Sequence, residues 1–160
     1  MRLRGIVFED FVNYKKPSLF LITTSCDWKC CKEAGIPISV CQNSELMKSD
    51  VKEYSDESIY KAYSTNNISQ AIVIGGLEPM LQMEELINLI KTFRGNGCDD
   101  PIIIYTGFNK TEILYQIEQL KMFKNIIVKF GRYIKNSNPI YDEVLGVTLA
   151  SDNQYAEKIS

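Results

Sequence analysis

The sequence contains no histidine among its 160 residues. Imidazole is the usual side chain for proton transfer near neutral pH, and it is a common metal ligand. Its absence excludes imidazole acid–base catalysis and imidazole ligation, so a soft metal site in this chain would be built mainly from thiolates.

The sequence also lacks an excess of either charge and any long apolar run. Lys and Arg number 18 and Asp and Glu 20, for a formal net charge of -2, which gives no sign of a nucleic-acid or membrane-surface partner. No apolar run approaches the roughly 20 residues that span a bilayer. Glu9, Asp10 and Asn13 interrupt the N-terminal segment, which is therefore not a signal peptide. We expect a cytoplasmic protein with no nucleic-acid and no membrane partner.

The apolar residues predict alternating strands and helices within one domain, residues 1–160. Hydrophobic residues make up 45% of the chain, and its length suits a single core. Short β-branched runs bounded by glycine or hydroxyl residues are typical of strands buried on both faces. Such runs occupy residues 18–23, 71–74, 102–105 and 126–130. Residues 6–9 and 144–149 are candidates for further short strands.

Helices are expected between these strands. Ser55 is a candidate cap for a helix over residues 55–64. A second apolar stripe runs from Met83 to Phe93 and ends at Gly95, and a third follows a capping box of Asn109 and Glu112. The third stripe comprises Ile113, Leu114, Ile117 and Leu120.

The order of these elements predicts an α/β fold. Repeated βα units imply a parallel sheet with right-handed crossovers. The units are too few to close an eight-stranded barrel, so we expect an incomplete parallel βα barrel. In such folds the chemistry lies at the carboxyl ends of the strands.

The cysteines are the most informative residues of the sequence. Four of the five fall between Cys26 and Cys41, in a loop of residues 24–43 that follows the first predicted strand, while Cys98 stands alone. Clustered cysteines in a cytoplasmic protein indicate metal or redox chemistry. Some of them, Cys31 and Cys98 above all, could instead be small buried apolar side chains.

Two metal sites fit this loop. A tetrahedral zinc site would use four thiolates, but the adjacent Cys30 and Cys31 would then have to bind one ion, which is sterically awkward. A 4Fe-4S cluster with three protein thiolates would leave one iron open. The spacing favours the cluster over zinc.

Two motifs resemble those of the radical S-adenosylmethionine (SAM) enzymes. The three-residue gap between Cys26 and Cys30 opens the family motif Cys-x3-Cys-x2-Cys. The segment Gly75-Gly76-Leu77-Glu78-Pro79 resembles the family's Gly-Gly-Glu-Pro with one leucine inserted. The resemblance implies a 4Fe-4S cluster and bound SAM, with Gly75, Gly76, Glu78 and Pro79 beside the methionine end of SAM.

Further segments resemble one subgroup, the activating protein of anaerobic (class III) ribonucleotide reductase. Its Tyr-Thr-Gly-Tyr, Asp-Gly-Arg-Phe, Ser-Ser-Asn-Gln and Val-Asn-Gly segments correspond to residues 105–108, 130–133, 151–154 and 12–14. Individually these matches are weak, but they occur in the family's order. They imply that the protein generates a glycyl radical on a large reductase partner, with an electron from a donor such as flavodoxin or ferredoxin.

The third cysteine departs from the family pattern. The family spacing would place it at position 33, which is Glu33. We assign it to Cys41, because Cys41-Gln42-Asn43 resembles the family's Cys-x-Asn. The ligand set is then Cys26, Cys30 and Cys41, with Cys31 as the rival of Cys41.

The resemblance also implies SAM contacts from Asn43 and Thr106. Val40 occupies a position where the family usually has an aromatic residue against the adenine, so Trp28 is the candidate replacement. We expect no catalytic residues beyond the cluster ligands, and we expect Asn153 and Gln154 to be solvated.

The sequence thus predicts an oxidoreductase that reductively cleaves SAM at a 4Fe-4S cluster. Two alternatives stay open. One is a radical SAM enzyme that acts on a small molecule, nucleotide or peptide. The other is a non-catalytic module in which the cysteines bind zinc or a cluster.

Overall fold

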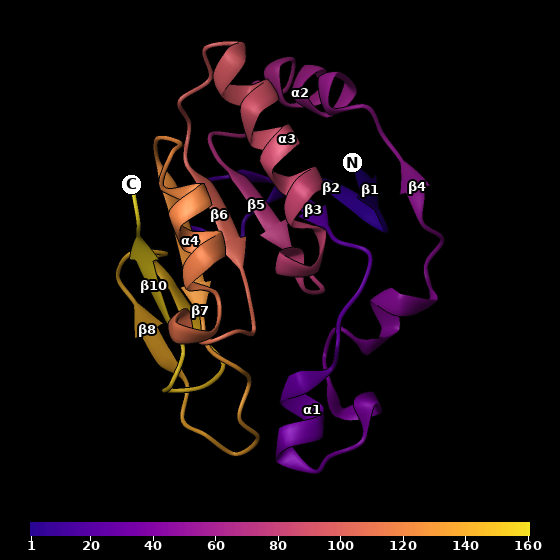
Figure 1. Ribbon diagram of the computed structural model, residues 1–160, viewed down its shortest axis with the longest axis vertical. Coiled ribbons are helices and arrows are strands. Elements are labelled where there is room, and N and C mark those ends of the chain that lie inside the picture. The colour runs from indigo at the N-terminus through magenta and orange to yellow at the C-terminus, as the bar shows by residue number, and fades with distance from the viewer.

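The computed structural model describes all 160 residues and is built around a six-stranded sheet (Figure 1). The strand order is β10-β7-β6-β5-β3-β2. The bounds are β2 Gly5–Asp10, β3 Ser18–Ile22, β5 Ile72–Gly75, β6 Ile102–Tyr105, β7 Ile126–Phe130 and β10 Tyr155–Lys158. The four central strands, at the four positions predicted from sequence, are parallel, and the edge strands β2 and β10 are antiparallel to their neighbours.

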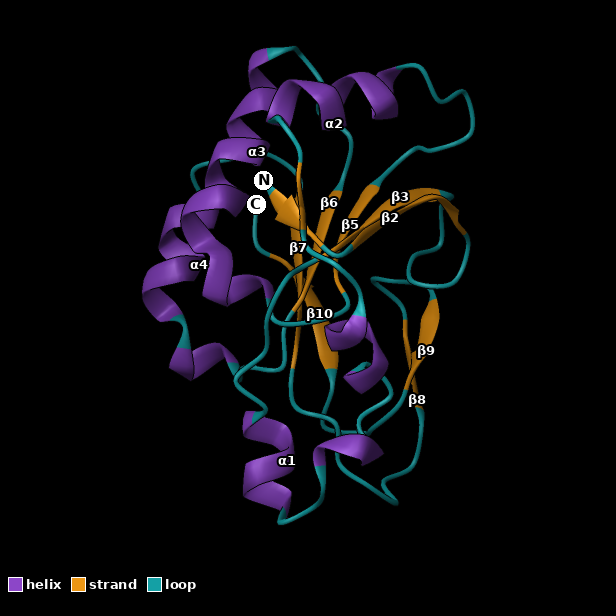
Figure 2. Cartoon of the chain, turned by 90° about the vertical axis from the view of Figure 1, so that its right-hand side faces the viewer, coloured by secondary structure: helices purple, strands orange, loops and turns teal.

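Both faces of the parallel strands are covered, which is why these strands are mostly apolar, with Lys129 of β7 as their one charged residue. Ile72 and Ile74 pack into a core with α2 (Asp56–Ser64), α3 (Met83–Gly95) and α4 (Leu114–Leu120). Val73, on the opposite face, packs against a smaller cluster that includes Leu149 of the hairpin β8 (Ile140–Asp142) and β9 (Val147–Leu149). Figure 2 shows the three helices on one side of the sheet and the hairpin on the other.

The expected helices are confirmed, with one correction. Ser55 Oγ accepts a hydrogen bond from Ser58 N at 3.1 Å, and the capping box of Asn109 and Glu112 is formed. Leu114, however, is 56% exposed. Ile113, Ile117 and Leu120 keep helical spacing and are buried, whereas a residue directly after Ile113 is turned about 100° away from that stripe.

Both segments proposed as further short strands contain one, although only the first joins the main sheet. Residues 6–9 lie in β2, and residues 147–149 form β9, which pairs with β8 in a separate hairpin. Strand β10 was not predicted, because a short edge strand of mixed composition carries little periodicity. A further small pair joins β1 (Arg2–Leu3) to β4 (Lys52–Glu53). Because β2 and β10 do not pair with each other, the sheet is open, and the partial barrel stays a prediction.

The four parallel strands end at the same edge of the sheet. Beyond this edge lies the cysteine loop with α1 (Lys29–Ala34) and the short helical turns η1 (Ile38–Val40) and η2 (Ser44–Lys48) (Figure 1). The turns that follow β5, β6 and β7 face the same region. None of the helices is long and apolar enough to cross a membrane.

Candidate functional site

The cysteine loop turns sharply before α1. Trp28 adopts the left-handed conformation, with φ of 58°, and its N–H donates to Cys26 Sγ at 3.3 Å. Asp27 Oδ1 accepts from Lys29 N at 3.0 Å and supports the same turn. This local geometry brings Cys26 and Cys30 to the wall of one cavity.

That cavity, about 400 Å³ in volume, is here called the strand-end chamber. It is lined by all three predicted cluster ligands, Cys26, Cys30 and Cys41, whose side chains are partly exposed. Five of the seven residues expected to contact SAM also line it: Trp28, Asn43, Gly76, Glu78 and Thr106. Gly75 and Pro79 do not.

The remaining cysteines lie elsewhere. Cys31 is 3% exposed, and burial together with the nearby Cys30 raises its pKa to about 11. Cys31 lines a second cavity, which adjoins the strand-end chamber, but it does not line the strand-end chamber itself. Cys98 packs against the large core, and its Sγ lies 3.7 Å from Asp100 Oδ2. Burial also raises the pKa of Cys26, to about 12, a cost that ligation of the thiolate to iron would have to offset.

The thiols fit a cluster better than a single ion. No three Cys, Asp or Glu side chains lie close enough together to hold one metal ion. A zinc site needs donors that converge on one point, whereas a 4Fe-4S cluster binds its thiolates through different irons and separates them. Cys26, Cys30 and Cys41 all line one chamber, as the ligands of one cluster must.

Glu78 joins the ends of β5 and β6. Its carboxylate is 4% exposed; Oε1 accepts from Thr106 Oγ1 at 2.7 Å and from Met80 N at 3.1 Å, and Oε2 accepts from Gly107 N at 2.8 Å. Burial raises the pKa of Glu78, and the three donors act in the opposite direction. Since each carboxylate oxygen can accept two hydrogen bonds, Oε2 keeps one acceptor site for a further donor.

The two glycines before Glu78 have different constraints. A Cβ on Gly75 would lie 2.9 Å from Tyr105 Cβ, so this position permits the close approach of β5 and β6. Gly76 has φ of 79°, and a Cβ there would lie 2.8 Å from Ile22 Cγ2. Pro79 is buried at the start of the turn η3 (Pro79–Gln82). Gly75 and Pro79 thus shape the turn, whereas Gly76 both shapes it and lines the chamber.

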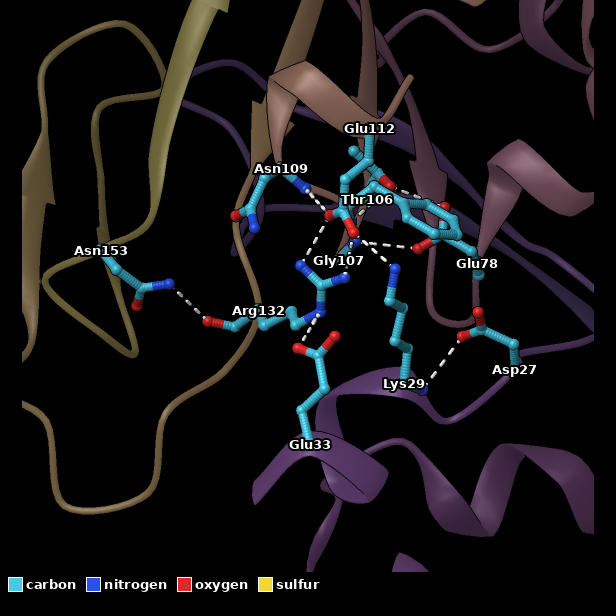
Figure 3. Close-up of polar contacts among 11 residues, drawn as sticks. Asp27, Lys29, Glu33, Glu78, Thr106, Gly107, Asn109, Glu112, Arg132 and Asn153 are labelled. Carbon is cyan, nitrogen blue, oxygen red and sulfur yellow. Dashed lines mark hydrogen bonds and ion pairs between the residues drawn. The ribbon is translucent and has the colours of Figure 1, made fainter. Parts of the chain in front are cut away.

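Residues 130–133 and 151–154, two of the segments whose family resemblance is individually weak, meet at the end of β7. Gln154 Nε2 donates to Gly131 O at 3.2 Å, and Asn153 Nδ2 donates to Arg132 O at 2.9 Å (Figure 3). Gln154 is buried, so the expectation that it is solvated was wrong. The reason is the turn before β10, which folds over the end of β7. Gln154 Oε1 closes this turn by accepting a hydrogen bond from Ser151 N.

The sequence analysis missed Lys129. This residue of β7 is 6% exposed and lines the strand-end chamber. Its Nζ donates to Gly131 O at 3.0 Å and lies 6.0 Å from the centre of the Tyr105 ring, and burial lowers its pKa to about 8. A single lysine within the apolar run of residues 126–130 was the available signal.

A charge network fastens α1 to the sheet (Figure 3). The Arg132 guanidinium donates to both carboxylate oxygens of Glu112 at 2.7 Å, and Lys29 Nζ donates to Glu112 Oε1. Arg132 Nε also lies 2.8 Å from Glu33 Oε2. These cations hold the pKa of Glu112 well below its ordinary value. The network therefore helps to fix the loop that carries Cys30.

Comparison with protein families identifies the chain. The sequence model of a family described as a 4Fe-4S single cluster domain matches residues 18–153. The chain therefore belongs to this family of iron–sulfur proteins, and the prediction of a 4Fe-4S cluster is confirmed at that level. The matched range runs from β3 through the cysteine loop to the turn before β10. Comparison with curated proteins and with solved structures gives no match.

Proposed function

We propose that the protein is a radical SAM enzyme whose cluster is held by Cys26, Cys30 and Cys41. The observation that carries the proposal is the strand-end chamber, which these thiols share with Gly76 and Glu78. With SAM on its open iron, the reduced cluster would supply one-electron cleavage of SAM and abstraction of a hydrogen atom from a substrate carbon.

The protein's own residues would bind and orient SAM. The free acceptor site on Glu78 Oε2 suits the α-ammonium group of SAM. Gly76 leaves room for the methionine moiety, Asn43 offers an amide at the same wall, and Trp28 offers an aromatic face to the adenine. Thr106 already donates to Glu78 and accepts from Phe108 N at 3.0 Å, which supports a role as a positioning residue.

We further propose that the hydrogen donor is a glycine Cα of a large glycyl-radical reductase, with flavodoxin or ferredoxin as the electron donor. The order of the segments that resemble the class III activating protein supports this assignment. So does the contact between two of these segments, residues 130–133 and 151–154, at the wall of the chamber.

The test is anaerobic reconstitution with iron and sulfide, followed by dithionite and SAM and measurement of 5′-deoxyadenosine. We expect product from the wild-type protein, and its loss with the cluster in Cys26→Ala, Cys30→Ala and Cys41→Ala. Cys31→Ala and Cys98→Ala are the controls and should keep both. If the cluster and the product depend on Cys31 and not on Cys41, Cys31 is the third ligand. If a stable cluster forms but never yields 5′-deoxyadenosine, the protein is a non-catalytic cluster-binding module.

A further inference from the structure

A second cavity adjoins the strand-end chamber and is here called the hairpin chamber. Its volume is about 290 Å³. It shares Cys30, Cys41, Asn43 and Lys129 with the strand-end chamber, and its other walls include residues 147–150 and Gln42. A group bound in it would lie directly beside the predicted cluster ligands.

One wall of the hairpin chamber contains strand β9. Four consecutive residues, 147–150, line the cavity. The first three of them form β9, so this strand runs along the wall of the cavity. Strand β9 pairs with β8 on one side only, and no backbone group of residues 147–150 is hydrogen-bonded on the other side. The edge is thus free to pair with another strand.

The remaining walls offer polar groups that suit a peptide backbone. Gln42 and Asn43 line the chamber with their side-chain amides; both residues are exposed, and Asn43 also lines the strand-end chamber. Lys129 Nζ has one hydrogen-bond partner, Gly131 O, which leaves two of its three N–H groups for acceptors such as carbonyl oxygens. A free strand edge in one cavity with exposed amides is an arrangement that binds an extended peptide by strand addition.

We propose that the hairpin chamber binds an extended, glycine-containing peptide segment of the partner protein as an added strand on β9. The proposal rests on the proposed function and gives its substrate a binding mode. Pairing with β9 would fix the segment by its backbone, and the shared wall of Cys30 and Cys41 would place its glycine next to the SAM site. The hydrogen atom lost by the glycine Cα would be the one gained by the 5′ carbon of the cleaved SAM fragment.

The test uses the reconstituted full-length protein and a library of N-acetylated, C-amidated pentapeptides with glycine at the centre. Hydrogen exchange is measured with and without peptide at those backbone amides of residues 147–149 that point away from β8. We expect library members to slow this exchange by about tenfold or more, because the open strand edge becomes paired. Failure of the whole library to slow exchange at β9 would overturn the proposal.

N-methylated peptides distinguish strand addition from other binding. Only alternate residues of an added strand direct their N–H groups to the neighbouring edge. For any peptide that binds, methylation of one alternate set of amides should therefore abolish the protection of β9, and methylation of the other set should not. Equal effects of both sets would overturn the added strand.

A pair of variants locates the binding. Ala150→Trp places a large ring at the wall of the hairpin chamber and should abolish the protection. Asn67→Trp adds the same side chain at an exposed site in the loop between α2 and β5 and should keep it. Binding that survives Ala150→Trp would contradict the proposed location.

The outcomes for the two proposals can be told apart. Production of 5′-deoxyadenosine without peptide tests the SAM chemistry alone, whereas exchange at β9 tests the peptide site alone. With a peptide deuterated at the glycine Cα, deuterium should appear in 5′-deoxyadenosine. If peptides protect the amides of β9 but SAM is not cleaved, the peptide site stands and the radical chemistry is wrong. If SAM is cleaved but no peptide protects β9, the radical chemistry stands and the peptide site is wrong.

Discussion

Glu33 Oε2 lies 2.8 Å from Arg132 Nε, and this ion pair joins α1 of the cysteine loop to the segment after β7. The other two nitrogens of the guanidinium donate to Glu112. Position 33 is where the spacing of the radical SAM motif would place the third cysteine. In this chain a charged pair, in place of a thiolate, holds that part of the loop, and the third thiol of the strand-end chamber comes from Cys41.

The first prediction concerns this network. Arg132→Gln should lower the free energy of unfolding by about 1–3 kcal/mol, a value between those for exposed and buried ion pairs. Its side chain is 10% exposed, and Glu112 loses the two guanidinium donors while it keeps Lys29 Nζ. Urea denaturation measures the change. Glu157→Gln breaks the more exposed pair with Lys110, which solvent screens, and should cost less than Arg132→Gln. Equal effects of the two substitutions would show that the network adds no special stability.

The second prediction concerns acid. The pKa of Glu112 in the folded state lies well below its ordinary value of 4.5, chiefly because Arg132 and Lys29 donate to it. Its contribution to stability is therefore complete above about pH 4.5 and is lost as the pH falls below that value. Glu112→Gln should destabilise the protein at pH 7 and destabilise it less at pH 3, where part of this contribution is already lost.

Urea denaturation midpoints of Glu112→Gln and the wild type, measured between pH 3 and pH 7, give the difference in stability. Arg132→Gln removes the main cation and should flatten the same part of the pH profile. If stability depends on pH in the same way in Glu112→Gln and in the wild type, the assignment of this pH dependence to Glu112 is wrong.

The sequence predicted the parts of the molecule that have a strong local pattern. The four parallel strands were predictable because burial on both faces makes them continuous apolar runs. The helix after Ser55 was predictable because its cap acts locally. Strand β10 was not, since its place beside β7 depends on the antiparallel return of the chain, which no short window of sequence records.

The site shows the same division. Cys26 and Cys30 share a short turn, so their proximity follows from spacing. The approach of Gln154 to Gly131 and of Glu33 to Arg132 depends on segments that are far apart in the chain. Such contacts arise from the packing of the whole sheet, and the sequence could indicate them only through the order of its motifs.

The third prediction concerns the turn after β5. Gly76→Ala combines a left-handed conformation with a Cβ that would lie 2.8 Å from Ile22 Cγ2. Gly97 has nearly the same φ, 78°, but its Cβ would have no neighbour within 4 Å. Gly97→Ala should therefore cost about 1–2 kcal/mol, from backbone strain alone.

Gly76→Ala should cost about 1–3 kcal/mol more than that, because the methyl group overpacks the turn. Thermal or urea unfolding of the two variants gives the difference directly. If both alanines cost the same, the close contact at Ile22 relaxes freely, and the shape of this turn is not restricted to glycine by packing.

The fourth prediction concerns the support of Glu78. Thr106→Val keeps the shape of the side chain but removes the hydroxyl that donates to Glu78 Oε1 at 2.7 Å and accepts from Phe108 N. The loss should cost about 1–3 kcal/mol, because Glu78 Oε1 keeps only the donor Met80 N and Phe108 N loses its acceptor. Thr106→Ser keeps the hydroxyl and should retain both hydrogen bonds.

The cost of Thr106→Val should also depend on pH in a defined direction. Burial already raises the pKa of Glu78 above 4.5, and removal of a donor raises it further. A raised carboxyl pKa destabilises the folded state increasingly as the pH rises above its ordinary value. The difference in unfolding free energy between Thr106→Val and the wild type should therefore be larger at pH 7 than at pH 4.5. A difference that is the same at both values would mean that Thr106 supports the turn without acting on the charge of Glu78, and the carboxylate would then owe its orientation to the backbone donors of Met80 and Gly107 alone.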